Sequence, residues 1–129
     1  MVDIREQSPL ALAFVGDAVY TLLIREKIVT ETRCPVAKLN KRSVSYISAK
    51  GQFMALELIA PMLTEEEANM VRRGKNSSKA SVAKHASVEE YRASTGFECL
   101  LGYLKLTDRQ DRINQLVDYI VENLKFENQ

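Results

Sequence analysis

Two apolar stretches dominate the pattern of hydrophobic and polar positions, and each contains a single charge. Residues 10–24 (LALAFVGDAVYTLLI) contain Asp17, and residues 94–104 (STGFECLLGYL) contain Glu98. In the first stretch apolar side chains would cover nearly every side of a helix, which is typical of a central helix rather than a surface one. Gly16 lowers the stability of a helix interior, so its presence there favours a close approach by another backbone.

Helix signals recur through the rest of the chain, whereas the period-two alternation of strands is hard to find, so we predict an all-α fold. Ser8 followed by Pro9 marks the start of the first helix, which should run to about Lys27. A second helical region should open at Pro35 and reach residue 60, just before a proline, with Gly51 as a candidate break.

Capping boxes predict where the later helices begin. The three boxes are Thr64 with Glu67, Ser87 with Glu90, and Thr107 with Gln110. The first should start a short helix that runs to about Arg73 and ends at Gly74. The second should start the helix that carries Glu98. The third should start a final amphipathic helix, whose apolar residues follow the i, i+3, i+4 spacing. Residues 75–86 (KNSSKASVAKHA) show no helical stripe and predict an exposed, basic loop.

The length of 129 residues fits one domain, residues 1–129, with a single hydrophobic core. A hydrophobic content of 46% with 27% charged residues is typical of a globular chain rather than a disordered one. No secretory signal is recognisable, and the stretch around Asp17 is too short for a membrane span. Cys34 and Cys99 do not suggest a disulfide framework. We therefore expect a soluble cytoplasmic protein without a membrane partner.

The basic residues are unevenly distributed although the net charge is only +1. No acid lies between Glu31 and Glu57 or between Glu67 and Glu89, and these two segments hold 10 of the 18 basic residues. A nearly neutral chain can therefore still present a basic surface to a polyanion. The alternative is that each segment forms an ordinary solvated face.

Asp17 and Glu98 are the strongest candidates for a functional site. A carboxylate in an apolar face loses hydration, and two carboxylates brought together also repel each other. A divalent metal such as Mg²⁺ would resolve both problems, because hard cations take oxygen ligands and keep several waters. The alternatives are that each acid pairs with a base such as Lys50 or Arg92, or that it lies at a helix edge in water.

Missing motifs narrow the chemistry. His85 is the only histidine, which argues against a zinc site with several His or Cys ligands and against a serine triad. Residues 74–77 (GKNS) resemble the end of a phosphate loop, but Asn69 stands where the loop needs its first glycine. Two acids with a metal and a basic surface instead suit phosphodiester hydrolysis, since the metal activates water and the bases hold phosphates.

These motifs resemble a known family. Residues 14–19 (FVGDAV) resemble the signature helix of ribonuclease III domains, and residues 97–102 (FECLLG) resemble their second acidic motif, with Cys99 in place of the usual Ala. The match runs from about residue 10 to 106, and includes residues 48–50 (SAK) and 71–76 (VRRGKN). The sequence is most similar to the Mini-III ribonucleases, which have the catalytic domain without a domain for binding double-stranded RNA.

The resemblance implies a helical homodimer of the ribonuclease III endonuclease fold that cuts double-stranded RNA with Mg²⁺ and matures the 23S ribosomal RNA precursor. It implies that Asp17 and Glu98 are the metal-binding catalytic residues. It places Phe14 at the dimer interface, with an ordinary core role as the alternative, and it allows for a ribosomal protein as an auxiliary partner. The implied RNA-binding residues are Arg72, Arg73, Lys75, Asn76, Lys79 and Lys84.

Two positions depart from full-length ribonuclease III enzymes and keep rival functions open. Ala13 and Thr95 stand where those enzymes have further acids, although Mini-III members resemble this chain at both places. Waters and RNA phosphates would then supply most of the other metal ligands. The main rival is a degenerate module that binds structured RNA without cutting it. A weaker rival is a helical adaptor that binds protein and holds both acids in ion pairs.

Overall fold

The computed structural model describes residues 1–79 and 87–126, and these residues form helices without any strand. The all-α prediction is therefore confirmed. The elements are the short 3-10 helices η1 (Ile4–Glu6) and η2 (Ala60–Met62) and the α-helices α1 (Pro9–Glu31), α2 (Val36–Ile47), α3 (Ala49–Ile59), α4 (Glu65–Ser77), α5 (Val88–Leu106) and α6 (Gln110–Asn123).

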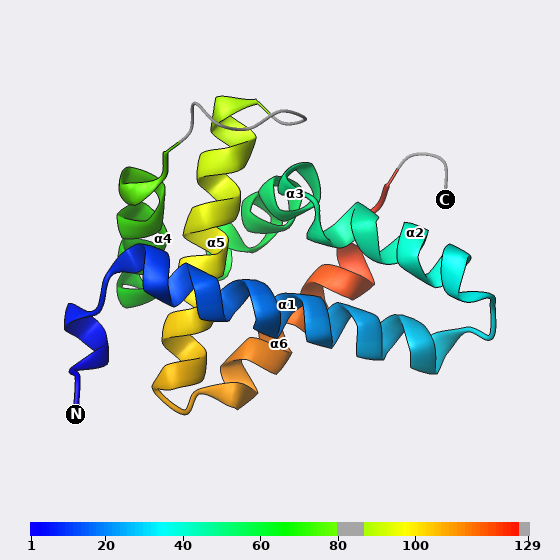
Figure 1. Ribbon diagram of the computed structural model, residues 1–129, viewed down its shortest axis with the longest axis horizontal. Helices are drawn as coiled ribbons and strands as arrows, with labels where there is room; N and C mark the ends of the chain where they lie inside the picture. Colours follow the sequence, from blue (N-terminus) through cyan, green and yellow to red (C-terminus); the bar gives the residue numbers. More distant parts are fainter. Residues whose placement is uncertain (80–86, 127–129) are drawn as a thin grey trace.

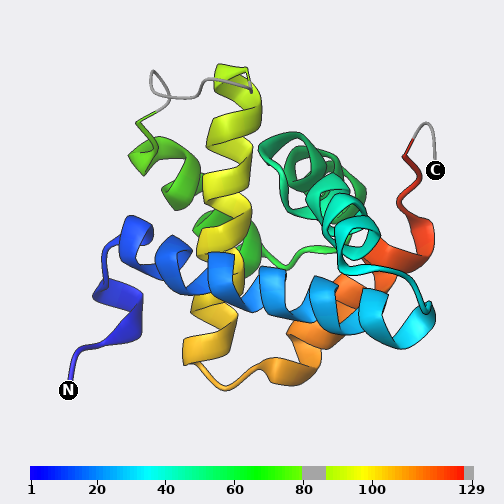
Figure 2. The ribbon, with the colours of Figure 1, turned by 45° about the vertical axis from the view of Figure 1, so that its right-hand side comes forward.

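Helix α5 is the centre of the fold. In Figures 1 and 2 it runs between α4 on one side and α3 on the other, while α1 crosses it. Every residue from Ala93 to Leu104 is buried except Glu98. The rings of Tyr20 and Phe97 meet edge to face, with their centroids 4.8 Å apart, where α1 and α5 cross. The two apolar stretches of the sequence therefore form the main contact of the core.

The break in the second helical region lies at Ser48 and not at Gly51. Ser48 has extended backbone angles (φ −64°, ψ 161°), and its hydroxyl accepts a hydrogen bond from the amide of Gly51 at 3.1 Å, which caps α3. Gly51 is needed for another reason. A Cβ added there would lie 2.0 Å from the carbonyl oxygen of Ser45, so only glycine lets α2 and α3 pack this closely.

Two predicted helix ends differ from the structure. Helix α1 continues to Glu31, and α4 continues through Gly74 to Ser77, so residues 75–77 are helical rather than part of a loop. A Cβ on Gly74 would lie 2.7 Å from the Cα of Gly96, so this glycine serves the contact between α4 and α5 and does not end the helix.

Two of the three predicted capping boxes are confirmed. Thr64 and Ser87 each accept a hydrogen bond from the backbone of the third helical residue, whose glutamate bonds back to the cap. The third prediction is wrong, because the Thr107 hydroxyl donates to the carbonyl of Tyr103 at 2.8 Å and makes no cap for α6. Arg109 stands at the cap position of α6, and its side chain makes no capping hydrogen bond to this helix.

Two glutamates at the start of α4 tie this helix to the beginning of α6. Arg109 donates to Glu66 from both terminal nitrogens, at 2.8 and 3.1 Å, and Arg112 donates to both oxygens of Glu67 at 2.8 Å. Hydrogen bonds from Arg109 and Tyr103 lower the pKa of Glu66. Burial alone would raise the pKa of Glu67, but the bonds from Arg112 and the Thr64 amide outweigh it and lower this pKa too.

Candidate active site

Two glycines bring the backbones of α1 and α5 into contact. A Cβ on Gly16 would lie 1.7 Å from the carbonyl oxygen of Glu98, and a Cβ on Gly102 would lie 1.8 Å from that of Leu12. Any larger residue would force the helices apart, so the expectation of a close backbone approach at Gly16 is confirmed. Asp17 follows Gly16 directly and therefore lies beside Glu98.

The carboxyl groups of Asp17 and Glu98 interact with each other. Asp17 is exposed, whereas Glu98 is partly buried. Burial raises the pKa of Glu98 to about 8, and the neighbouring negative charge of Asp17 adds to the shift. A hydrogen bond from the Nε2 of Gln52 to the Oε2 of Glu98, at 3.2 Å, acts in the opposite direction.

Neither acid pairs with a base in the described part of the chain. The ion pairs found there join other residues. Arg92, one candidate partner, donates instead to the carbonyl of Lys75 at 3.1 Å and to the Oδ1 of Asn76 at 3.4 Å. Lys50, the other candidate, is exposed and forms no ion pair with either acid. The ion-pair alternative therefore finds no support among residues 1–79 and 87–126.

The residues around the two acids suit a hard divalent cation. Their oxygens lie together without a balancing positive charge, and the Oε1 of Gln52 beside them is buried without a hydrogen-bond partner. Mg²⁺ takes oxygen ligands and binds through one or two carboxylates while retaining waters. Within the described ranges no group of three or more His, Cys, Asp or Glu side chains could hold a metal, so these residues offer two carboxylates at this place.

Ala13 and Thr95 contribute no acid and both are buried, at 6% and 7% exposure. Ala13 lies one helical turn before Asp17, and Thr95 lies nearly one turn before Glu98. The Thr95 hydroxyl bonds to the carbonyl of Tyr91 at 3.1 Å and to the hydroxyl of Ser78 at 3.4 Å. Its hydrogen bonds thus serve packing between α5 and the end of α4.

The predicted RNA-binding residues lie on and after the last turns of α4. Arg72, Asn76 and Lys79 are exposed, and Lys75 is partly exposed. Arg73 differs from them, because its guanidinium donates to the backbone carbonyls of Arg5 at 3.2 Å and Gln7 at 3.3 Å and so fixes the N-terminal segment. The sixth residue, Lys84, lies outside the described residues, as does most of the predicted basic loop.

Phe14 is 83% exposed on α1. Leu10 and Leu22 on the same helix are 41% and 59% exposed, and the spacing 10, 14, 18, 22 places them on one face with Ala18. The alternative of an ordinary core role for Phe14 is therefore wrong for this chain alone. No helix of the described residues is long and apolar enough to cross a membrane.

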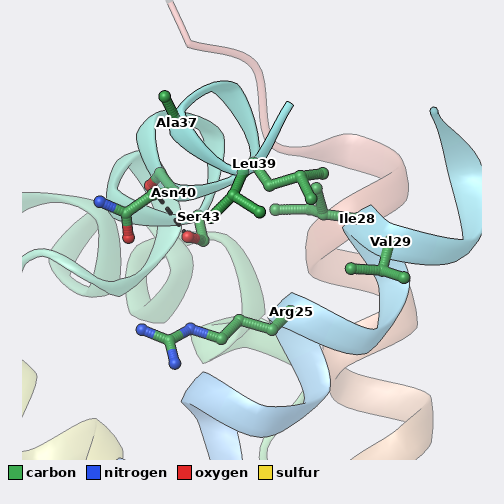
Figure 3. A pocket seen from close by; sticks show the side chains of 8 residues that line it. Arg25, Ile28, Val29, Ala37, Leu39, Asn40 and Ser43 are labelled. Carbon is green, nitrogen blue, oxygen red and sulfur yellow. Dashed lines mark hydrogen bonds between the residues drawn. The ribbon is translucent and has the colours of Figure 1, made fainter. Parts of the chain in front are cut away.

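A hollow of about 560 Å³ lies between the C-terminal half of α1 and α2. Figure 3 shows the guanidinium of Arg25 at its edge, with apolar side chains from both helices forming much of its lining. None of its lining residues belongs to the predicted metal or RNA sites. This hollow is therefore separate from the pair of acids.

Sequence reasoning missed Gln52. The only available signal was an uncharged polar residue in the largely apolar segment from Gly51 to Ile59. Nothing local shows that its amide faces Glu98, 46 residues away along the chain.

Comparisons with known proteins agree with this geometry. The family model of the Ribonuclease III domain matches residues 10–109. Mini-ribonuclease 3 of Thermoanaerobacter sp. is 45% identical over 115 residues, covering 89% of this chain and 81% of that protein. Mini-ribonuclease 3 of Enterococcus faecalis is 40% identical and covers 96% of both chains, and that of Streptococcus pneumoniae is 38% identical and covers 97% and 99%.

A solved structure shows the same fold. The crystal structure of a Fusobacterium nucleatum protein superposes with a TM-score of 0.85 at 29% identity, covering 95% of this chain and 98% of that one. The sequence match spans the helices that bring Asp17 and Glu98 together, and the structural match spans nearly all described helices. This chain belongs to the ribonuclease III family and, within it, to the Mini-ribonuclease 3 group.

Proposed function

We propose that this protein is a Mg²⁺-dependent endoribonuclease that cleaves double-stranded RNA. The observation that carries the proposal is the contact between the Asp17 and Glu98 carboxyl groups, which no base among the described residues neutralises. Membership of the ribonuclease III family supports the reaction class.

In this proposal Asp17 and Glu98 are the catalytic residues and hold the metal ion. When bound, the cation supplies a nucleophile near neutral pH and stabilises the charge that develops on the phosphate oxygens. Asp17 is exposed, so one side of the pair is open to a phosphodiester. Glu98 is partly buried on α5. The raised pKa of Glu98 describes the protein without metal, and a cation at the site favours the ionised form.

The RNA backbone would bind to the basic residues at the end of α4 and beyond. Arg72, Lys75, Asn76 and Lys79 can reach phosphates, and Lys84 is proposed from the sequence alone. The deep, narrow major groove of an A-form duplex hides its base edges, so phosphates and 2′-hydroxyls would be read more than bases. Arg73 is a poorer candidate than the others because two backbone carbonyls already occupy its guanidinium.

We propose a homodimer that forms through the exposed apolar face of α1 around Phe14, because a cut in each strand of a duplex needs two sites. Phe14→Glu should convert the dimer to a monomer in analytical ultracentrifugation. The control is Val88→Glu, which alters an apolar residue that is 56% exposed at the start of α5, where an acid is tolerated. A Phe14→Glu protein that sediments like the wild type would exclude this interface.

The natural substrate in this proposal is the precursor of 23S ribosomal RNA in the cytoplasm, with a ribosomal protein as an auxiliary partner. The relatives' names support ribonuclease activity. Incubation of precursor RNA with the purified protein, alone and with ribosomal proteins, tests it. If the protein cleaves other RNA duplexes but leaves the 23S precursor uncut, this substrate assignment is excluded.

The decisive experiment is cleavage of a duplex RNA by the purified protein in Mg²⁺, compared with the same reaction in EDTA. We expect fragments with Mg²⁺ only, and binding without fragments in EDTA or Ca²⁺. The rival function is a module that binds structured RNA, which Ala13 and Thr95 favour because they leave the site with two acids. Binding that persists without cleavage at every Mg²⁺ concentration would establish this rival.

A further inference from the structure

Gln52 is a buried amide whose two N–H groups are both occupied. It lies in α3 with 3% of its surface exposed. Its Nε2 donates to the carbonyl of Ile47 at 2.9 Å and to the Oε2 of Glu98 at 3.2 Å. This side chain therefore links the α2–α3 corner to the Glu98 carboxylate.

These two bonds determine how the amide is oriented. A flipped amide would direct its oxygen at the carbonyl of Ile47, which can only accept a hydrogen bond. The Oε1 of Gln52 is consequently left without a donor among the described residues, although it is buried. It is bonded to the same carbon as Nε2, so it lies close to Glu98.

A role in packing alone does not account for this oxygen. Burying an acceptor without a donor costs stability, and a methionine or leucine would fill a similar volume without that cost. Buried polar atoms without a partner often indicate a water or ion that belongs there. Beside Glu98, a hydrated divalent cation would provide the missing donor through its waters.

We propose that Gln52 is a positioning residue of the metal site, in which Nε2 fixes the Glu98 carboxylate and Oε1 accepts a hydrogen bond from the hydration shell of the cation. The inference rests on the proposed function of Asp17 and Glu98. Side chains that hydrogen-bond to a metal-binding carboxylate restrict its rotation and keep it oriented toward the metal. They also hold the waters that the metal retains.

The test is Mn²⁺ binding to the intact protein without RNA, measured by isothermal titration calorimetry and by electron paramagnetic resonance. Gln52→Met keeps the length of the side chain and removes both amide atoms. We expect it to weaken Mn²⁺ binding about 10- to 100-fold. The Mg²⁺ concentration for half-maximal cleavage should rise by a similar factor, while duplex RNA binding in EDTA stays unchanged.

Ser43→Ala is the matched control. Ser43 is also buried, at 2% exposure, its hydroxyl donates to the carbonyl of Asn40 at 2.9 Å, and it lines the hollow between α1 and α2. It should lower the thermal midpoint without changing Mn²⁺ affinity. If Gln52→Met does not fold, Gln52→Asn provides the test, because it keeps an amide but is too short to reach Glu98 in the same way.

The outcomes separate the two proposals. A folded Gln52 variant with wild-type Mn²⁺ affinity overturns this inference, even if its thermal midpoint falls. A wild-type protein that neither binds Mn²⁺ nor cleaves duplex RNA overturns the proposed function itself. Weaker Mn²⁺ binding in the Gln52 variant, with normal binding in Ser43→Ala, supports the positioning role.

Discussion

Two pairs of acids in this molecule have opposite surroundings. Glu66 and Glu67 each receive a bidentate arginine, and the resulting bonds join α4 to α6. Asp17 and Glu98 instead face each other where α1 crosses α5, with the Gln52 amide but no cation from the described residues. The first pair has a lowered pKa at both glutamates, whereas the pKa of Glu98 is raised.

The contrast separates acids that arginines neutralise from acids that the described residues leave without a counter-charge. A partly buried acid that a fold uses for stability is accompanied by its counter-charge, since an unpaired one destabilises the protein. Among the described residues, that counter-charge is present at Glu67 but not at Glu98. In the proposed function, a bound cation supplies the positive charge that the described residues do not place beside Asp17 and Glu98.

Replacing Asp17 should produce the largest effect. Asp17→Asn keeps the shape of the side chain and removes its charge, so we expect duplex cleavage to fall by at least about 10³-fold, because several kcal/mol of metal assistance is lost. The free energy of unfolding without metal should stay the same or rise slightly, as Asp17 no longer repels Glu98. RNA binding in EDTA should persist, because the basic residues are intact.

Asp118→Asn is the matched control for that experiment. Asp118 is an exposed acid of α6 that pairs with Lys27, so its charge belongs to the surface and not to the site. Its variant should cleave RNA like the wild type. An Asp17→Asn protein that cleaves at the wild-type rate would show that the two acids do not hold the catalytic metal.

Replacing Glu67 should affect stability and not chemistry. Glu67→Gln keeps a residue able to complete the capping box with Thr64 but leaves Arg112 without its anion. Glu67 is 3% exposed, so we expect the free energy of unfolding in urea to fall by about 3 kcal/mol. The folded variant should retain the kcat of the wild type.

Glu65→Gln gives the reference for that loss. Glu65 is an exposed acid in the same first turn of α4, so its replacement removes only a favourable interaction with the helix dipole, about 0.3–1 kcal/mol. Equal losses for Glu65→Gln and Glu67→Gln would contradict a special role for the buried arginine pair.

The meeting of Asp17 and Glu98 was easier to predict from the sequence than the arginine pairs of Glu66 and Glu67. Asp17 and Glu98 are the only charges in two apolar stretches, so burial of those stretches places them in one core. The bonds of Glu66 and Glu67 join residues 43 and 45 positions apart, in segments rich in exposed charge, where no local pattern selects partners. The helix cap at Thr64 was predicted correctly, because its side-chain and backbone bonds lie within four residues. The cap at Thr107 was predicted wrongly, because its hydroxyl donates to the carbonyl of Tyr103 in the preceding helix.

In the metal-free protein, the two pairs of acids should change the free energy of unfolding with pH in opposite directions. Glu98 has an ordinary pKa of 4.5 and a folded pKa of about 8, so the folded state binds more protons than the unfolded state between these values. The free energy of unfolding should therefore fall from about pH 5 to about pH 8, on the order of 1–2 kcal/mol, because coupled acids share the effect. Glu66 and Glu67 have lowered pKa values, so their stabilisation is lost only as the pH falls below the ordinary value.

Urea titrations at several pH values in EDTA measure this dependence. Glu98→Gln should flatten the fall between about pH 5 and about pH 8, because the group that titrates is gone. In the wild type, saturating Mg²⁺ in place of EDTA should also reduce the fall in the free energy of unfolding between these pH values. A slope that is the same in the wild type and in Glu98→Gln would assign the dependence to other groups.

Replacing Glu66 should have the smallest effect on the free energy of unfolding. Like its neighbour Glu67, Glu66 accepts two hydrogen bonds from one arginine. The side chains of Glu66 and Arg109 are 47% and 40% exposed, so water screens their attraction. Glu66→Gln should lower the free energy of unfolding by less than about 1 kcal/mol, and high salt should remove the difference. Glu66 and Glu67 are adjacent on one helix and differ mainly in burial. If Glu66→Gln and Glu67→Gln lost the same stability, the number of arginine hydrogen bonds, and not burial, would determine how strongly each pair joins α4 to α6. The contrast with Asp17 and Glu98 would then lose its physical basis.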